Sequence, residues 1–144
     1  MLKSIDPMLG PDLLATLRAM GHGDDIAIVD SNFPASSMGR PVIRMDGIDA
    51  VRILDAVLSV MPLDTFVPDA AWRMEVVGDP KAEMPIFSEF RRVIAAREGA
   101  QFGLASLERF AFYERAKGVF AVVVSGEGRL YGNIILKKGI IPPG

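Results

Sequence analysis

The sequence contains one histidine, His22, and its setting suits acid–base chemistry. It lies between Gly21 and Gly23, directly after a segment with helical spacing, so backbone and ligand can approach it closely. The negative end of that helix favours the charged imidazole. An imidazole in this position could donate or accept a proton near neutral pH. The alternative interpretation is a polar cap that bonds only helix carbonyls.

A carboxylate, Asp30, follows the apolar run Ile26–Val29. The C-terminal end of a buried strand is where open α/β sheets place their ligands, so Asp30 is a candidate for ligand binding. His22 and Asp30 could border one crevice only if the chain bends between them, since a strand advances about 3.3 Å per residue. Alternatively, Asp30 forms a turn and bonds its own loop backbone.

Charges and aromatic rings are interleaved in the segment Glu108–Arg115. Arg109 offers a rigid fork of donors, and Tyr113 offers an apolar plate with a hydroxyl. That combination suits a sugar, with Tyr113 in a secondary role. The alternative is a helix with one solvated and one buried face.

The segment Tyr131-Gly132-Asn133 is a further candidate for binding. In a strand, Tyr131 and Asn133 would point to the same side, with a gap free of side chains at Gly132. A phenol and an amide in one cleft can bond hydroxyls, whereas the alternative is a strand start with a bulge at the glycine. Together with the other candidates, these groups suit a neutral polyhydroxylated ligand and proton transfer better than acyl or phosphoryl transfer.

Composition excludes several classes of function. Zero cysteines exclude a disulfide framework and a thiolate zinc site, and with a single histidine we expect no metal. A formal charge of −2 argues against a nucleic-acid partner. No apolar run reaches the roughly 18 residues of a membrane span, and Met1–Pro7 lacks the apolar run of a signal peptide. We therefore expect a soluble, cytoplasmic protein.

The elements that must position these groups alternate between helix and strand. A length of 144 residues predicts one domain, residues 1–144. We expect an α/β fold, a single layered domain with a mixed, mostly parallel sheet flanked by helices. Gly21 is expected to end the first helix in the left-handed conformation, and the last two strands to form an antiparallel hairpin. The apolar periodicity predicts helices within Pro11–Met20, Ile48–Met61, Ile86–Gly99 and Phe112–Lys117, and strands at Ile26–Val29, Val42–Met45, Trp72–Val77, Leu107–Phe110, Val119–Val124 and Leu130–Leu136.

Four segments in chain order resemble the L-fucose mutarotase branch of the ribose pyranase and fucose mutarotase family. They are Gly21–Asp24, Asp30–Pro34, Arg109–Arg115 and Tyr131–Gly139, and the similarity runs essentially from end to end, with Pro80–Ser106 the least matched. Members of this family interconvert anomers or ring forms of free sugars without a cofactor. The resemblance implies an isomerase that interconverts the α and β anomers of free L-fucose by acid–base ring opening and closure.

The resemblance also implies a role for each matching residue. The family's proton donor falls on His22, and its sugar-binding aspartate falls on Asp30. The arginine of the fucose branch falls on Arg109, where ribose-type members carry a histidine. The closing sugar-binding motif falls on Tyr131, Gly132 and Asn133.

The resemblance further implies an assembly. Family members form ring-shaped homo-oligomers, decamers in the bacterial cases, with the sugar cleft at a subunit boundary. Phe33 or Met38 could line such a contact or a sugar face. Two alternatives remain open: D-ribose pyranase-type activity, which Arg109 disfavours, and a non-catalytic oligomeric protein that binds monosaccharides.

Overall fold

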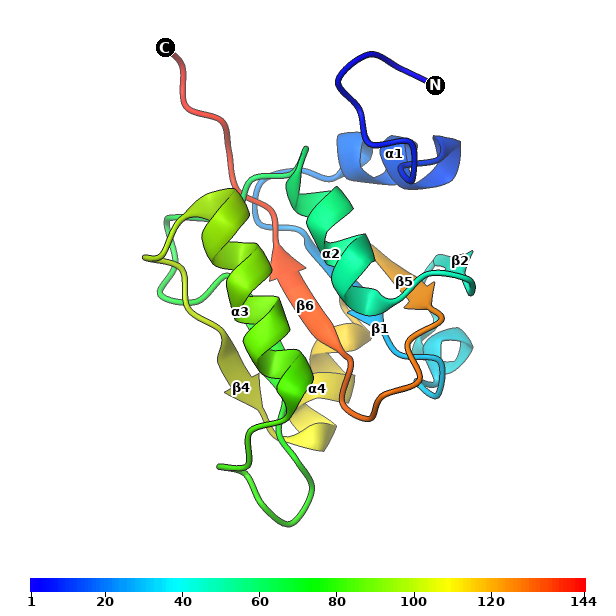
Figure 1. Ribbon diagram of the computed structural model, residues 1–144, viewed down its shortest axis with the longest axis vertical. Coiled ribbons are helices and arrows are strands. Elements are labelled where there is room, and N and C mark those ends of the chain that lie inside the picture. The colour runs from blue at the N-terminus through cyan, green and yellow to red at the C-terminus, as the bar shows by residue number, and fades with distance from the viewer.

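The computed structural model describes residues 1–144 and consists of one six-stranded sheet with helices on both faces (Figure 1). Local sequence explains where several helices begin. Proline occupies the first turn of α1 and α3, and the side chains of Asp49 and Glu108 accept backbone N–H groups at the starts of α2 and α4. In chain order the elements are α1 (Pro11–Ala19), β1 (Asp25–Val29), a 3₁₀ turn (Ala35–Met38), β2 (Val42–Met45), α2 (Ala50–Leu58), β3 (Ala71–Met74), α3 (Pro85–Glu98), β4 (Ala105–Leu107), α4 (Arg109–Ala116), β5 (Ala121–Ser125) and β6 (Ile134–Lys137).

The sheet has the strand order β2-β5-β1-β6-β3-β4. The pairs β1–β5, β2–β5 and β3–β4 are parallel, whereas β6 runs antiparallel to both of its neighbours, β1 and β3. The predicted mixed, mostly parallel sheet is therefore confirmed. Because β6 alone runs the other way, its N-terminal end lies beside the C-terminal ends of the other strands.

The predicted hairpin between the last two strands is wrong, because β1 lies between β5 and β6. All residues of Ile26–Val29 are buried, so β1 takes a central place in the sheet. The link from β5 to β6 passes across the C-terminal end of β1 on the way. Ser31 fixes it there, since both its backbone N–H and its hydroxyl donate to the Glu127 carbonyl, each at 2.9 Å.

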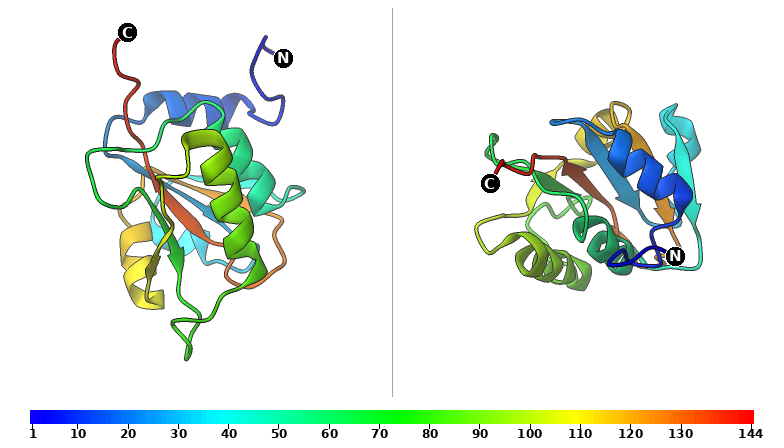
Figure 2. Two further views of the ribbon diagram at one scale, coloured as in Figure 1. Left: turned by 60° about the vertical axis from the view of Figure 1, so that its left-hand side comes forward. Right: turned by 90° about the horizontal axis from the view of Figure 1, so that it is seen from above.

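Two apolar cores lie on the two faces of the sheet. The larger one joins α1, α2 and α3 to one face, and the smaller one joins α4 and the 3₁₀ turn to the other (Figure 2). Alternate residues of β1 serve the two cores: Ile26 and Ile28 face the helical layer of α1 to α3, whereas Ala27 and Val29 face α4.

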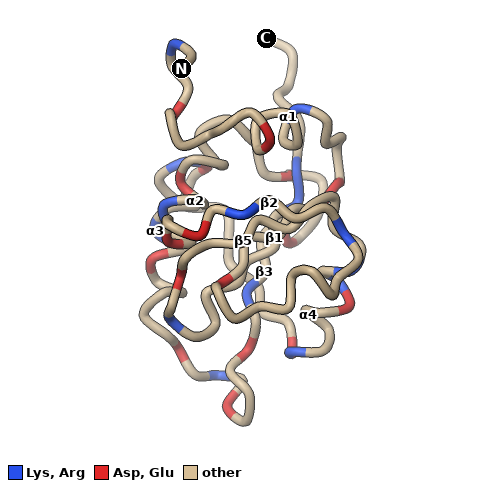
Figure 3. Tube along the Cα trace, turned by 90° about the vertical axis from the view of Figure 1, so that its right-hand side faces the viewer, with Lys and Arg blue, Asp and Glu red and all other residues tan.

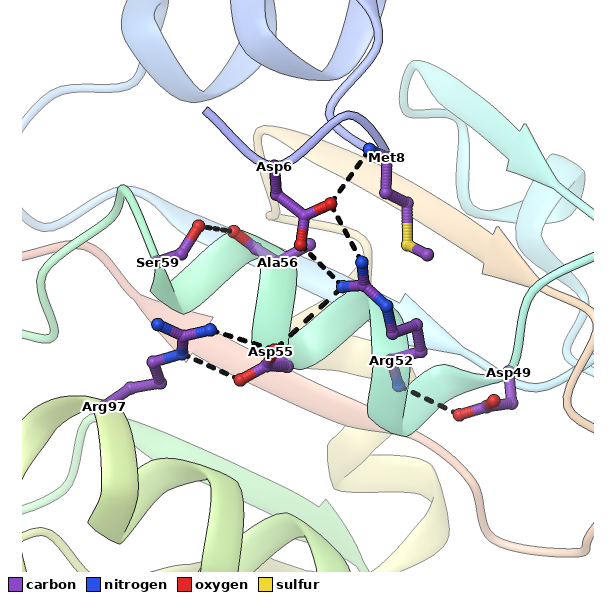
Figure 4. Close-up of polar contacts among 8 residues, drawn as sticks. All are labelled: Asp6, Met8, Asp49, Arg52, Asp55, Ala56, Ser59 and Arg97. Atoms are coloured by element: carbon purple, nitrogen blue, oxygen red, sulfur yellow. Dashed lines mark hydrogen bonds and ion pairs between the residues drawn. The ribbon is translucent and has the colours of Figure 1, made fainter. Parts of the chain in front are cut away.

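Charged side chains tie the segment before α1 and the helices α2 and α3 together at the surface. Arg52 donates to both oxygens of Asp6, at 2.7 and 2.9 Å, and Arg97 donates to both oxygens of Asp55, at 2.7 and 3.0 Å (Figure 4). Elsewhere, positive and negative side chains are interspersed along the chain (Figure 3). No helix is long and apolar enough to cross a membrane.

Three local predictions need correction. The segment Leu107–Phe110 is not a strand, because β4 ends at Leu107 and α4 begins at Arg109. Gly21 does not end α1 in the left-handed conformation; Met20 ends it in an extended one, and the left-handed glycine is Gly23, with φ of 87°. Tyr131 does not belong to a strand. It lies before β6 in the left-handed region, with φ of 63°. The prediction that Tyr131 and Asn133 point to the same side of a strand is therefore wrong.

Candidate functional site

A buried carboxylate–amide pair lies at the C-terminal end of β1. The backbone N–H of Asp30 donates to Asn133 Oδ1 at 2.8 Å, and Asn133 Nδ2 donates to Asp30 Oδ2 at 3.0 Å. Only about 5% of Asp30 and 4% of Asn133 is exposed. The pair forms because the antiparallel register of β1 and β6 continues beyond the strand ends and brings the two residues together.

The Asp30 carboxylate also bonds its own loop. Its Oδ1 accepts the Asn32 backbone N–H at 2.9 Å, as the turn interpretation predicted. Asp30 therefore both stabilises its own turn and belongs to the candidate site. Burial raises the pKa of Asp30, although hydrogen bonds from the backbone N–H of Asn32 and from the Asn133 side chain act in the opposite direction. A partly desolvated carboxylate at the C-terminal edge of a mostly parallel sheet is a strong acceptor for a ligand hydroxyl.

This pair lies at a cavity of about 180 Å³. Pockets that hold drug-sized ligands start at about 300 Å³, so this one suits a smaller molecule. The lining combines polar groups with an aromatic wall, in which the Phe33 and Tyr113 rings lie 5.5 Å apart. The lining residues are Asp30, Asn32, Phe33, Met74, Val77, Arg109, Tyr113, Leu130, Tyr131 and Asn133.

Two groups in the cavity have donor capacity to spare. Arg109 is the first residue of α4, and its Nε is buried without a hydrogen-bond partner. The Tyr131 hydroxyl accepts the Val77 backbone N–H at 3.0 Å, which leaves its own proton free to donate. The left-handed backbone of Tyr131 costs of order 1–3 kcal/mol, and such strain concentrates at functional sites. The cavity therefore presents both acceptors and donors, as a neutral polyol requires.

Gly132 lies beside the cavity rather than in its lining. A side chain there would collide with Glu127, since a Cβ would lie 2.7 Å from the Glu127 Cγ. The glycine is thus needed for close packing of the turn before β6, and its backbone acts to lower the pKa of Asp30.

The structure does not bring His22 to this cavity. His22 precedes β1 and Asp30 follows it, and five strand residues at roughly 3.3 Å each separate their ends by about 17 Å. The chain does not bend back between them. In Figure 1, α1 lies at the end where β1 begins, and the turn before β6 lies at the other.

His22 has a partner of its own, which the sequence analysis missed. Its Nε2 lies 2.9 Å from Asp64 Oδ1; the imidazole is 43% exposed, whereas the Asp64 side chain is only 4% exposed. Burial raises the pKa of Asp64, but hydrogen bonds from the Phe66 N–H and from His22 outweigh it, so the net pKa is lowered. No motif links residues 42 positions apart, so only the fold could reveal the pair.

The rim of the cavity and the His22 turn both expose apolar side chains. Val77 and Leu130 at the cavity, and Phe110 in the adjoining hollow that also contains Val77, are between 54% and 62% exposed. Phe66, whose ring centroid lies 5.2 Å from that of His22, is 70% exposed. Large apolar groups exposed at both places are typical of surfaces that contact a partner. Met38, in contrast, is buried in the core, whereas Phe33 lines the cavity.

Comparisons with known proteins agree in family and fold. Residues 3–141 match the model of the RbsD / FucU transport protein family. A human protein named fucose mutarotase is 47% identical, with 97% of this chain and 94% of the human protein covered. The crystal structure of the fucose mutarotase from Streptococcus pneumoniae in complex with L-fucose is 41% identical, with a TM-score of 0.90 and coverage of 98% of this chain and 100% of that one.

A more distant structure has the same fold. Bacillus subtilis RbsD complexed with D-ribose has a TM-score of 0.76, with 99% of this chain and 100% of that chain covered. At 21% identity, this likeness concerns the fold alone. Since the family model spans nearly the whole chain and the human relative is 47% identical, the chain belongs to the RbsD / FucU family.

Proposed function

We propose that this protein is a mutarotase that interconverts the α and β anomers of free L-fucose. The observation that carries the proposal is the small cavity at Asp30, with its unpartnered Arg109 and buried Asn133, in a chain 41% identical to a fucose mutarotase crystallised with L-fucose. A family relationship alone would leave the sugar open. Arg109 in the cavity favours fucose over ribose, because it stands where ribose-type members carry a histidine.

The reaction breaks and remakes one bond. A proton reaches the ring oxygen while another leaves the anomeric hydroxyl, so the C1–O5 bond breaks and an open aldehyde forms. Rotation about C1–C2 turns the other aldehyde face toward O5, and the reverse proton transfers close the ring. No atom or electron is gained or lost, so the proposed reaction proceeds without a cofactor.

We assign proton transfer to and from the sugar to His22. With Nε2 donating to Asp64, Nδ1 is left to accept or donate a proton at the exposed side of the ring. A positioned acid–base group of this kind contributes about 10²–10⁴-fold to the rate. Asp30, Arg109, Tyr131 and Asn133 would hold the sugar hydroxyls, and Gly132 would contribute its backbone.

His22 would serve the cavity of a neighbouring copy of the chain. It cannot reach the cavity of its own chain, while the exposed Phe66 beside it and the exposed rim of Val77, Phe110 and Leu130 are apolar surfaces that two copies could bury against each other. The proposal therefore includes a homo-oligomer, a decameric ring by family resemblance. It also includes a cytoplasmic location, compatible with a chain that has no cysteine.

Saturation-transfer NMR on equilibrated L-fucose tests the activity, with D-ribose in a parallel sample. Irradiation of one anomeric proton should reduce the signal of the other in an enzyme-dependent manner, and more strongly with fucose. Faster exchange with ribose alone would instead support pyranase-type activity. Broadened sugar signals without exchange would identify a binding protein.

A further inference from the structure

The segment Lys137–Gly139 continues β6 and contacts both the turn that carries His22 and the loop that carries Asp64. Lys138 O accepts the Gly23 N–H at 2.8 Å, and Lys138 N donates to Asp24 O at 2.9 Å. The backbone N–H and C=O of Lys138 thus both bond the two residues that follow His22, Gly23 and Asp24.

The Lys138 side chain holds the other flank of the same turn. Its Nζ donates to Leu17 O at 2.7 Å and to Met20 O at 2.6 Å, which are carbonyls left without intrahelical partners at the end of α1. The ammonium lies at the negative end of the helix, where a cation is favoured. No acidic side chain pairs with it, so its contacts are those with the turn.

The neighbours of Lys138 hold the loop that carries Asp64. Lys137 O accepts the Asp64 N–H at 3.1 Å, and the Gly139 N–H donates to Pro62 O at 2.8 Å. Gly139 packs so closely that a Cβ on it would lie 2.4 Å from Leu63 O. Both members of the His22–Asp64 pair are therefore held by one short segment.

We propose that Lys138 is a positioning residue that sets the imidazole of His22 against Asp64. This inference rests on the proposed function, in which His22 transfers the proton. Lys138 does not line the cavity at Asp30 and touches no sugar there; it acts through the Met20–Asp24 turn. Loss of its ammonium removes the bonds to Leu17 O and Met20 O and loosens the N-terminal flank of the turn, which keeps only the Gly21 N–H bond to Asp24 and the Met20 N–H bond to Thr16. The C-terminal flank stays bonded, so the ring shifts while the fold persists.

The test is Lys138→Met, which keeps the length of the side chain and removes its donors. Because the chain has one histidine, the ring ¹⁵N and ¹³C signals of His22 are identified without assignment. We expect these signals to move or broaden and kcat for L-fucose exchange to fall about tenfold or more, with KM unchanged. Lys138→Arg should restore part of both effects. Lys117→Met is the matched control, because Lys117 is exposed and bonds only Glu114 through its side chain.

The outcomes separate this inference from the proposed function. Unchanged His22 signals in Lys138→Met overturn the inference whatever the activity. Altered signals with unaltered kcat, together with an active His22→Ala variant, overturn the role of His22 in the proposed function instead. If Lys138→Met does not fold, the shorter and uncharged Lys138→Gln is measured in its place, and His22 signals identical to those of the native chain again overturn the inference.

Discussion

The two ends of β1 carry the two halves of the proposed chemistry and are built in opposite ways. At the C-terminal end, the Asp30 carboxylate is buried beside a cavity whose lining residues all come from one chain. At the N-terminal end, the imidazole of His22 is exposed and the carboxylate beneath it, Asp64, is buried. A binding site needs enclosure, whereas a group supplied to a neighbour must project outward. This difference between the two ends is what the proposed site, shared by two chains, requires.

The pKa values of the two carboxylates are shifted in opposite directions. Burial raises the pKa of Asp30, whereas hydrogen bonds from the Phe66 N–H and His22 lower the pKa of Asp64 despite its burial. Both are almost fully buried, so burial alone does not set the direction. At Asp64 the hydrogen bonds from the Phe66 N–H and His22 outweigh the effect of burial, whereas at Asp30 the effect of burial outweighs the hydrogen bonds.

Complementation between two inactive variants gives the largest expected effect. His22→Ala should reduce kcat/KM for L-fucose about 10²–10⁴-fold, because it removes the acid–base group. Asp30→Asn should reduce it about 10- to 100-fold, because it removes a charged acceptor for a sugar hydroxyl. If the site is shared, subunits mixed by co-expression should recover about a quarter of the native activity, because a quarter of the boundaries then pair two intact halves. The readout is the exchange rate by saturation-transfer NMR.

The matched control for complementation mixes two variants of the same half-site, Asp30→Asn and Arg109→Met. Every cavity in that mixture carries a defect, so no recovery is expected. A mixture of His22→Ala and Asp30→Asn that stays as inactive as its components would argue against a shared site.

The next effect concerns the N-terminal end alone. Asp64→Asn keeps the shape of the side chain and can still accept the Phe66 N–H, but it removes the negative charge that stabilises a protonated imidazole. We expect kcat to fall about ten- to a hundredfold. KM should stay unchanged because Asp64 does not line the cavity. A change in KM without a change in kcat would place Asp64 in sugar binding instead.

The sequence predicted the Asp30 end better than the His22 end. Asp30 lies at an element boundary that apolar periodicity reveals, and the parallel sheet gathers such boundaries at one edge. Arg109 was predicted as a candidate by its residue type, but it begins α4 and does not lie inside the strand expected at Leu107–Phe110. The position of Asn133 at that edge follows from the strand order, which the sequence did not reveal. Asn133 precedes a strand that runs antiparallel to β1, rather than one paired with β5 in a hairpin.

The His22–Asp64 pair could not be predicted because nothing local encodes it. Asp64 lies two residues after Pro62 in a loop, and backbone bonds to Lys137 and Gly139 bring that loop to the His22 turn. The left-handed Tyr131 was missed for a related reason. Alternating apolar residues predicted a strand, but the hydroxyl bond to Val77 and the close packing of Gly132 on Glu127 accompany a turn there instead.

The opposite pKa shifts predict opposite effects of pH on stability. For Asp64, whose folded pKa is lowered, the stabilisation is present above the unfolded pKa and is lost as pH falls through the folded one. For Asp30, whose folded pKa is raised, the stabilisation is fully present below the unfolded pKa and is lost as pH rises through the folded one. Chemical unfolding at pH values from 3 to 7 should therefore show that, as pH falls, the native chain loses stability relative to Asp64→Asn and gains it relative to Asp30→Asn. Parallel pH dependences for the two variants would contradict this assignment.

The smallest effect is expected at a carboxylate that belongs to neither end of β1. The bidentate bond from Arg52, together with the Met8 N–H, lowers the pKa of Asp6 to about 2, so a lowered pKa by itself does not mark a site.

Asp6→Asn should leave fucose exchange unchanged and lower the thermal unfolding temperature slightly at pH 7. Since the folded pKa is depressed from 3.8, this contribution is present above pH 3.8 and disappears as pH falls through about 2. The native chain and the variant should then unfold at the same temperature at the acid limit and differ at neutral pH. A loss of exchange activity in Asp6→Asn would mean that the Arg52–Asp6 bonds affect the position of α1 and, through α1, the His22 turn. Unchanged activity would mean that the contrast between the two ends of β1 does not depend on these surface bonds.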